Sequence, residues 1–187
     1  MANRNPSDRS RTVVESGVRD QGGRIVDAAA YDRLARSGCF VCAIVQGRPL
    51  LPDPQVVYED SQVIAFLNHF PTQEGYVLVC PRRHVERFER DLTTDEWAHL
   101  QRVVQRVAAA VSDATGAIRT YIASLGSPER NAHVHVHVCP CPAGTPFDHQ
   151  QFAAMMHRDG VHRMAPPERQ RLIASRIRER LQDGPAP

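Results

Sequence analysis

NAHVHVHVCP, residues 131–140, places His133, His135 and His137 at strictly alternate positions with valine between them. Successive side chains of a β-strand point to opposite faces, so a strand over residues 132–139 puts all three imidazoles on one face. Neighbouring imidazoles on that face lie roughly 6.6 Å apart, twice the rise per residue, which lets two of them meet one metal ion or one small ligand. The stretch therefore predicts a strand that carries a chemical site.

Short apolar stretches separated by turn residues surround this strand and predict the rest of the sheet. The clearest helix begins at Thr93, which has the capping-box spacing with Glu96 and is followed by an apolar stripe from Trp97 to Val111. Short neighbouring strands broken by one central helix predict an α+β fold with a mainly antiparallel five-stranded sheet. The other expected strands span residues 55–60, 62–67, 75–81 and 117–125, and further helices are expected over residues 24–37, 147–156 and 166–182.

The chain has the length of one domain, and its composition excludes several kinds of site. We expect a flexible tail over residues 1–22, the domain proper over 23–146 and a helical extension over 147–187. All 23 basic residues are arginine, which excludes a lysine-containing phosphate loop and a lysine Schiff base. The net charge of +2, with no signal-peptide core or membrane-length apolar run, predicts a cytoplasmic protein that binds small molecules and neither nucleic acid nor membrane.

Cys39 and Cys42 form a C-x-x-C motif, a spacing at which two thiolates can reach one metal ion. His84, just after the third expected strand, and His133 are the natural further ligands, and a Cys₂His₂ set is typical of a closed structural zinc site. A redox motif shares this spacing, but it is expected at a helix start after a strand in a βαβ pattern, which the sequence lacks. The remaining alternative is two buried free cysteines beside an unrelated histidine.

With His133 on a metal, His135 is the next imidazole on the same face and stays available to react. Neutral imidazole is a competent nucleophile near pH 7. His137 is placed to give a proton to a reacting group or to take one from it. A metal site that uses two or three of these histidines without catalysis is the alternative.

Two segments of the chain resemble one known family in the right order. HVHVHVC matches the His-φ-His-φ-His-φ-φ signature of the histidine triad nucleotide hydrolases and transferases. FLNHFPTQEGYVLVCPRRHVERFERDLTTDE, residues 66–96, is similar to the upstream half of that family, especially the fragile-histidine-triad dinucleoside polyphosphate hydrolases. The resemblance runs from about Cys39 to Pro142. It implies the histidine triad fold and a homodimer that pairs through the central helix and the adjoining strand.

The same resemblance implies a role for each matching residue. His135 would form a covalent nucleotidyl-histidine, with its second ring nitrogen oriented by the backbone carbonyl of His133, and His137 would lie near the scissile phosphate oxygens. Ser124 stands where relatives carry a longer Gln or Asn against the phosphates, and Tyr76 stands where a histidine is usual. The cysteine–histidine set resembles zinc-binding branches, including galactose-1-phosphate uridylyltransferases. The other residues implied to bind the nucleotide are Asn68 at the ribose, Phe40, Val41, Phe66 and Leu67 around the base, and Asn131.

The leading hypothesis is a zinc-containing enzyme that cleaves a nucleoside 5′-monophosphate from a dinucleoside polyphosphate or a related adenylated substrate. A nucleotidyltransferase or phosphorylase, which passes the nucleotidyl group to phosphate or a sugar phosphate, is the alternative within enzymes. A non-catalytic zinc-stabilised nucleotide-binding module is the alternative from another class, and such a module has no need of His135. A zinc finger for nucleic acid is disfavoured because two histidines one residue apart are too close for the usual ligand spacing.

Overall fold

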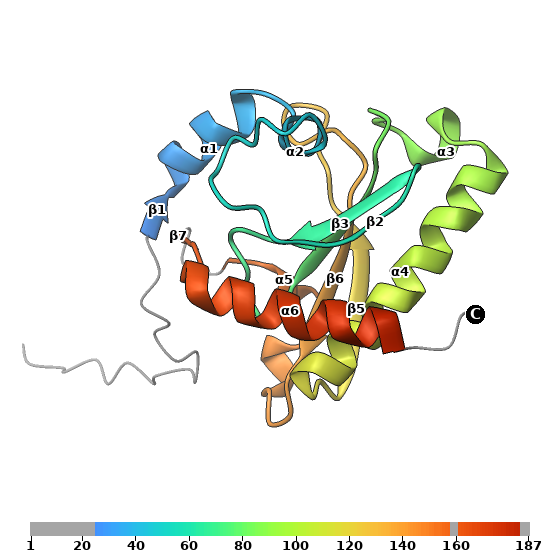
Figure 1. Cartoon of the computed structure of the whole chain (residues 1–187). Coiled ribbons are helices and arrows are strands. Elements are labelled where there is room, and N and C mark those ends of the chain that lie inside the picture. Colours follow the sequence, from blue (N-terminus) through green and yellow to red (C-terminus); the bar gives the residue numbers. More distant parts are fainter. Residues whose placement is uncertain (1–24, 158–160, 184–187) are drawn as a thin grey trace, which may run out of the picture.

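A five-stranded antiparallel sheet forms the centre of the fold in the computed structural model, which describes residues 25–157 and 161–183 (Figure 1). The strand order is β2-β3-β4-β6-β5, so β2 and β5 are the edges. This architecture confirms the predicted α+β fold. The strands are β2 (Val56–Glu59), β3 (Val63–Leu67), β4 (Val77–Pro81), β5 (Arg119–Ser124) and β6 (Val136–Cys141).

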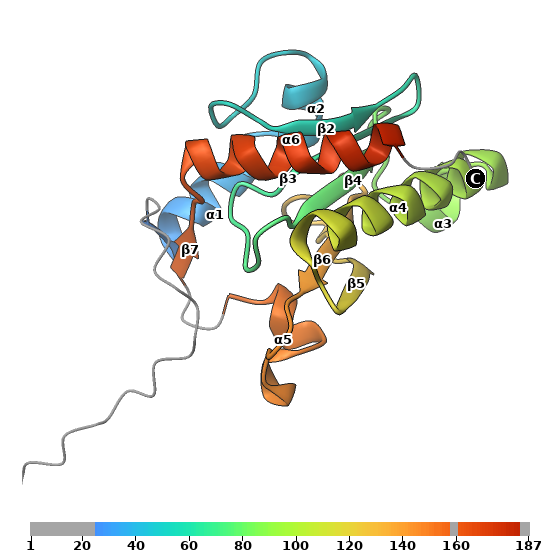
Figure 2. The same cartoon turned by 60° about the horizontal axis from the view of Figure 1, so that its bottom comes forward.

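The alternation of side chains along β3 and β4 divides the buried residues between the two faces of the sheet. Ala65, Leu67 and Val79 pack on one face against α4 (Thr94–Thr115) and α6 (Pro167–Asp183). These two helices lie in contact with each other, as both views show (Figures 1 and 2). Ile173, Ala174 and Ile177 of α6 are buried in this layer, so the final helix is packed into the same core as the sheet.

The opposite face of the sheet carries a smaller apolar layer and the candidate site. Phe66 and Leu78 contact α2 (Phe40–Val45) on this face. Beside it lies α1 (Ala28–Arg36), which Asp27 caps by accepting a hydrogen bond from the backbone N–H of Ala30. A two-stranded antiparallel sheet of β1 (Ile25–Asp27) and β7 (Val161–Arg163) joins the segment before α1 to the segment before α6. Thus α1, near the start of the described chain, contacts β7, near its end (Figure 2).

The central helix begins where the sequence predicts. The side chain of Thr93 accepts a hydrogen bond from the backbone N–H of Glu96, whose carboxylate accepts one from the backbone N–H of Thr93. Gly116 ends the helix with a left-handed backbone, φ 67°. The remaining short helices are α3 (Phe88–Asp91), η1 (Phe147–His149) and α5 (Phe152–Met155).

The structure corrects the expected strand over residues 132–139. Strand β6 begins only at Val136, so His133 and His135 precede it and His137 alone lies within it. The pairing explains this boundary, since both neighbouring strands align with β6 only as far back as Val136, through Val79 and Ser124. Upstream of that point, the backbone N–H of Val134 donates instead to the carbonyl of Val85 in a loop (2.8 Å).

Two other expected segments differ in detail, and a third lies outside the described residues. Residues 25–27 of the expected first helix form β1, because they pair with β7, a partner that no local pattern reveals. The expected helix over 147–156 is broken into η1 and α5, and Gln151 between them has φ 58°. The expected tail over residues 1–22 lies outside the described residues. No helix in the described part of the chain combines the length and the apolar character needed to cross a membrane.

Candidate functional site

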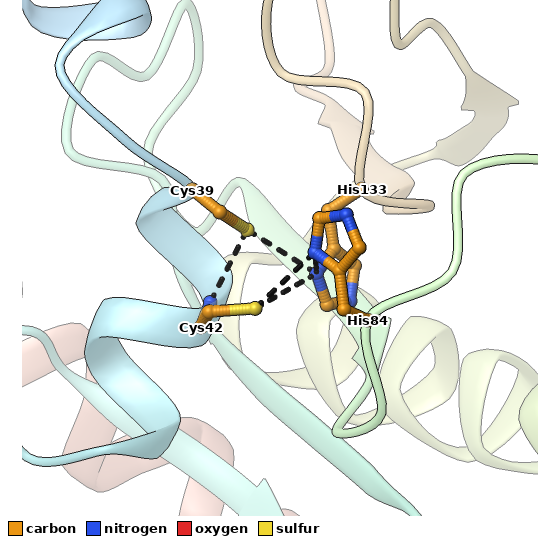
Figure 3. A group of neighbouring side chains, drawn as sticks. All are labelled: Cys39, Cys42, His84 and His133. Carbon is orange, nitrogen blue, oxygen red and sulfur yellow. Dashed lines mark hydrogen bonds between the residues drawn. The ribbon is translucent and has the colours of Figure 1, made fainter.

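Cys39 and Cys42 lie at the N-terminal end of α2 (Figure 3). Cys39 is the N-cap residue, and its Sγ accepts a hydrogen bond from the backbone N–H of Cys42 (3.4 Å). One helical turn therefore brings both sulfur atoms to the same side. The motif does begin a helix, as in redox sites, but α1 precedes it in place of a strand and both thiols face imidazoles.

His84 and His133 complete the cluster, and all four ligand atoms lie within 4.8 Å of one another. Cys39 Sγ lies 3.3 Å from His133 Nδ1, Cys42 Sγ lies 3.3 Å from His84 Nδ1, and the two Nδ1 atoms are 3.2 Å apart. A zinc tetrahedron with bonds of about 2.0–2.3 Å has edges of roughly 3.3–3.8 Å. The structure therefore brings together the four predicted zinc ligands at a spacing that fits one ion.

The surroundings of the two imidazoles also suit a metal. His133 Nε2 lies 2.9 Å from the carbonyl oxygen of Pro81, and His84 Nε2 lies 3.2 Å from the carboxylate of Glu86. If each Nε2 carries the hydrogen and donates it to its oxygen partner, each Nδ1 keeps a lone pair that can bind a metal. This arrangement is usual for metal-bound histidine. Burial lowers the pKa of His133 to about 4, so the ring is neutral. Burial and the neighbouring Cys39 raise the pKa of Cys42 to about 11, so its thiolate needs a cation beside it.

His135, two residues after the ligand His133, is buried and hydrogen-bonded to the backbone. Its Nδ1 lies 2.7 Å from the carbonyl oxygen of His133, and because a carbonyl only accepts, Nδ1 carries the hydrogen. Nε2, on the far side of the ring, therefore keeps its lone pair. Burial lowers the pKa of His135, which keeps the imidazole neutral and able to act as a nucleophile.

Gly126 is needed for the close packing around His135. A Cβ atom at this position would lie 2.8 Å from the carbonyl oxygen of Asn131 and 3.5 Å from Cε1 of His135. The first of these distances is shorter than any ordinary contact. The segment after β5 therefore approaches the segment that carries His135 closely only because residue 126 has no side chain.

His137 has one partnered and one unpartnered ring nitrogen. The hydroxyl of Tyr76 lies 2.8 Å from Nδ1, while Nε2 is buried with no hydrogen-bond partner in the described part of the chain. That hydroxyl has no other acceptor in the same residues, so it donates to Nδ1 and Nε2 carries the hydrogen. Burial and the neighbouring His135 lower the pKa of His137 to about 3. The ring is thus a neutral donor without a partner, which calls for a ligand atom.

His135 and His137 line a cavity on this face of the sheet. Phe40, Phe66, Asn68 and Asn131, which the family resemblance marked as nucleotide-binding, also line it. The cavity has further walls that the sequence did not indicate, and these come from α1, α2, the loop before β2, β4 and the residues that follow Asn68. These additional lining residues are Tyr31, Leu34, Ala35, Ile44, Pro49, Leu50, Leu51, His69, Phe70 and Leu78.

Three residues expected at the nucleotide do not line this cavity. Leu67 faces the α4 side of the sheet, because it alternates with Phe66 along β3. Val41 is fully buried in the apolar layer under α2. Ser124 is exposed at the end of the edge strand β5. Its short side chain therefore makes no wall of the cavity.

Asn68 is held firmly at the end of β3. Its Oδ1 accepts a hydrogen bond from the backbone N–H of Phe70 (2.9 Å), which leaves its side-chain amide N–H groups for a ligand. Its backbone carbonyl accepts a hydrogen bond from the side chain of Gln170 on α6 (3.2 Å). The C-terminal helix therefore contacts a residue that lines the cavity.

Arg130, Arg82 and His162 are outside the cavity lining and make contacts within the protein. Arg130 pairs with Asp32 of α1 and Arg82 pairs with Glu59, and neither arginine lines the cavity. His162 stacks on Tyr31, with ring centroids 3.7 Å apart, so it supports a wall of the cavity. These contacts tie α1 to the loop before the triad and to β7.

Comparisons with known proteins agree with this geometry. Residues 52–142 match the HIT domain family. The chain is 37% identical over 76 residues to an uncharacterized HIT-like protein of Saccharolobus solfataricus, which is 41% of this chain and 52% of that protein. A similar protein of Methanocaldococcus jannaschii is covered over 50% of its length, so the chain spans about half of the curated relatives it matches.

Two solved structures are similar over most of their length. One is a hypothetical histidine triad nucleotide-binding protein from Sulfolobus tokodaii, with a TM-score of 0.63, 26% identity, and 78% of this chain and 93% of that chain covered. The other is a zinc-bound histidine triad family protein from Mycobacterium smegmatis, with a TM-score of 0.57, 26% identity, and coverages of 76% and 94%. The sheet, the histidine triad and these likenesses agree with the match of residues 52–142 to the HIT domain family.

Proposed function

We propose that the chain is a nucleotide hydrolase in which His135 becomes transiently nucleotidylated. The observation that carries this proposal is the 2.7 Å contact from His135 Nδ1 to the carbonyl of His133. That bond fixes the tautomer in which Nε2 holds a lone pair, at a residue that lines the cavity. The match to the HIT domain family, together with the resemblance of the triad segment to histidine triad nucleotide hydrolases and transferases, supports a nucleoside phosphate as the ligand.

In the proposed reaction, Nε2 of His135 attacks the α-phosphorus of a dinucleoside polyphosphate or a related adenylated compound. An N–P bond forms, the bond from phosphorus to the bridging oxygen breaks, and the leaving group departs with that oxygen and its electron pair. Water then attacks the same phosphorus, the N–P bond breaks, and a nucleoside 5′-monophosphate is released with a proton from the water. His137 Nε2–H, which has no hydrogen-bond partner among the described residues, would donate a hydrogen bond to a phosphate oxygen in both steps.

The lining of the cavity supports binding of the nucleoside part. Phe40 and Phe66 provide aromatic surface for a base, and Asn68 offers amide hydrogens to ribose hydroxyls. Phe40 also contacts the His135 ring edge to face, with centroids 5.5 Å apart. A base held against Phe40 would thus have its phosphate within reach of the nucleophile.

We also propose that one zinc ion binds Cys39, Cys42, His84 and His133 as a structural metal. With two sulfur and two nitrogen ligands the site is closed, so zinc would take no direct part in the reaction. It would link α2, the segment after β4 and the segment before β6. Because His133 also provides the carbonyl that orients His135, the metal would hold the nucleophile in place indirectly.

A nucleotidyltransferase is the second candidate within enzymes. It would use the same His135 intermediate, with phosphate or a sugar phosphate in place of water, and the cavity has no feature that excludes either acceptor. A non-catalytic nucleotide-binding module would keep the zinc site and the aromatic walls. Such a module has no need of the fixed His135 tautomer, or of the His137 nitrogen that has no partner among the described residues.

We propose a homodimer on the basis of the exposed edge of the sheet. Strand β5 pairs only with β6 in the described part of the chain, and its other edge is unpaired. Ile122 in this strand and Ile118 just before it are 51% and 64% exposed. An edge strand with exposed apolar residues is suited to pairing with a second copy. Sedimentation of wild type and of Ile122→Glu at micromolar concentration tests this, since a wild-type monomer would contradict it.

The experiment for the main proposal measures turnover of diadenosine polyphosphates, with AMP as the product. Wild-type protein should release AMP, and His135→Ala should lose turnover by several orders of magnitude while keeping zinc and nucleotide binding. His137→Ala is the matched variant and should lose about 10²- to 10⁴-fold. The same assay is repeated with added phosphate or sugar phosphate. Hydrolysis gives AMP as before, whereas transfer gives the adenylylated acceptor. Full turnover by the His135 variant would overturn the proposal.

A further inference from the structure

His69 is a histidine of the cavity for which neither the sequence nor the proposed reaction has a role. It follows Asn68 directly, so it lies one residue beyond the position assigned to the ribose. Most of the residues that line the cavity are apolar, among them Ile44, Leu50 and Leu51. An imidazole in a mostly apolar lining is a natural place to recognise one polar group of a ligand.

The protein fixes which nitrogen of His69 carries the hydrogen. Nε2 lies 3.3 Å from the backbone carbonyl oxygen of Pro52, which can only accept, so Nε2–H is the donor. Nδ1 then keeps its lone pair. In the described residues Nδ1 has no hydrogen-bond partner, yet it is not among the buried atoms that lack one, so it is open to solvent or to a ligand. Burial lowers the pKa of His69, and the ring therefore stays a neutral acceptor at pH 7.

We infer that His69 determines base specificity, with Nδ1 accepting a hydrogen bond from the exocyclic amino group of a bound base such as adenine. This inference rests on the proposed function, because it places a nucleotide in the cavity. An acceptor at this position favours a base that offers an N–H. A base without that donor leaves Nδ1 unpaired after it has lost water, which weakens binding.

The test compares two nucleotides that differ only in the amino group. AMP and purine riboside 5′-monophosphate, which has hydrogen in place of the 6-amino group, are titrated into zinc-loaded full-length protein by calorimetry. Wild type should bind AMP roughly 2- to 10-fold more tightly, the range expected for one net hydrogen bond. His69→Phe keeps an aromatic ring but has no acceptor, so the ratio of the two dissociation constants should fall to about one.

His149→Phe is the matched control, because His149 lies in η1 and does not line the cavity. It should keep the wild-type ratio. His69→Leu provides a second variant should the phenylalanine variant fail to fold, and the wild-type ratio is decisive by itself. Equal binding of both nucleotides by wild type, or an unchanged ratio in the His69 variants, overturns the inference alone. Binding of neither nucleotide by wild type overturns it together with the proposed function.

Discussion

Replacement of Asp60 by asparagine should destabilise the protein by an amount that the structure allows us to estimate. Asp60 closes the turn between β2 and β3, the strand that leads to Phe66 and Asn68 of the cavity. Its carboxylate accepts hydrogen bonds from the backbone N–H groups of Gln62 and Val63, both at 2.8 Å. It also lies 2.7 Å from the hydroxyl of Tyr58 and 2.8 Å from Nε2 of His99.

Burial alone would raise the pKa of Asp60, but the hydrogen bonds outweigh it and lower the pKa from 3.8 to about 2. At about 1.4 kcal/mol per pH unit, this difference corresponds to about 2 kcal/mol of stability. The sign follows from the lowered value. The contribution is fully present above pH 3.8 and is lost as the pH falls through the folded-state pKa, about 2.

Urea unfolding of wild type and Asp60→Asn should therefore differ by about 2 kcal/mol at pH 7. The melting temperature should fall by roughly 4–8 °C for a chain of this size. The difference between the two proteins should close between pH 4 and pH 2. Asp113→Asn, at an exposed position of α4, is the control and should change stability by less than about 0.5 kcal/mol. Equal stabilities at pH 7, or a gap that persists at pH 2, would show that the ionised carboxylate of Asp60 does not stabilise the fold.

Three further substitutions test the zinc site, the hydrogen bond to His137 and the packing of α6. Cys42→Ser should lower both zinc content, measured by elemental analysis, and melting temperature, because metal binding and folding are coupled. Tyr76→Phe, which removes the hydroxyl bonded to His137, should cost about 1 kcal/mol of stability in urea unfolding and lower kcat more than it changes KM. Ile177→Ala, at a fully buried position of α6, should lower the free energy of unfolding by about 2–5 kcal/mol.

Each of these substitutions has a control and an outcome against it. Cys141→Ser, outside the cluster, should keep its zinc, and a Cys42 variant with full zinc would contradict the ligand assignment. An unchanged kcat for Tyr76→Phe would mean that the hydroxyl does not orient His137. Leu172→Ala, at a 54% exposed position of α6, should change stability little. An equally mild Ile177 variant would show that α6 does not stabilise the core.

Local patterns in the sequence predicted the parts of the structure that depend on neighbouring residues. The capping box of Thr93 and Glu96, the alternating strands and the antiparallel sheet are of this kind. The cluster of Cys39, Cys42, His84 and His133 was also predictable, because thiol and imidazole at such positions have few other uses. Caps and strand periodicity are properties of short segments, whereas the cluster joins residues far apart in the chain and was predicted from the chemistry of its four side chains.

The parts that the sequence did not reveal depend on long-range pairing. Strand β6 was expected to include all three histidines, but its start is set by the partners of Val136 on β4 and β5. The pairing of β1 with β7 and the wall that α1 adds to the cavity join residues more than 100 positions apart. The sequence analysis assigned no role to His69, and the role proposed for it depends on its bond to the carbonyl of Pro52, 17 residues earlier in the chain.

The most direct test of the central claim is to look for the covalent intermediate on His135. Wild-type protein is mixed with a diadenosine polyphosphate, quenched within one turnover under alkaline conditions, and analysed by intact and peptide mass spectrometry. We expect one adenylyl group per chain, bound through an acid-labile and base-stable N–P bond within the peptide that contains residues 131–140. The adduct should be absent from His135→Ala and present in His137→Ala. AMP release by wild type without any adduct, or an adduct that persists in His135→Ala, would contradict the account.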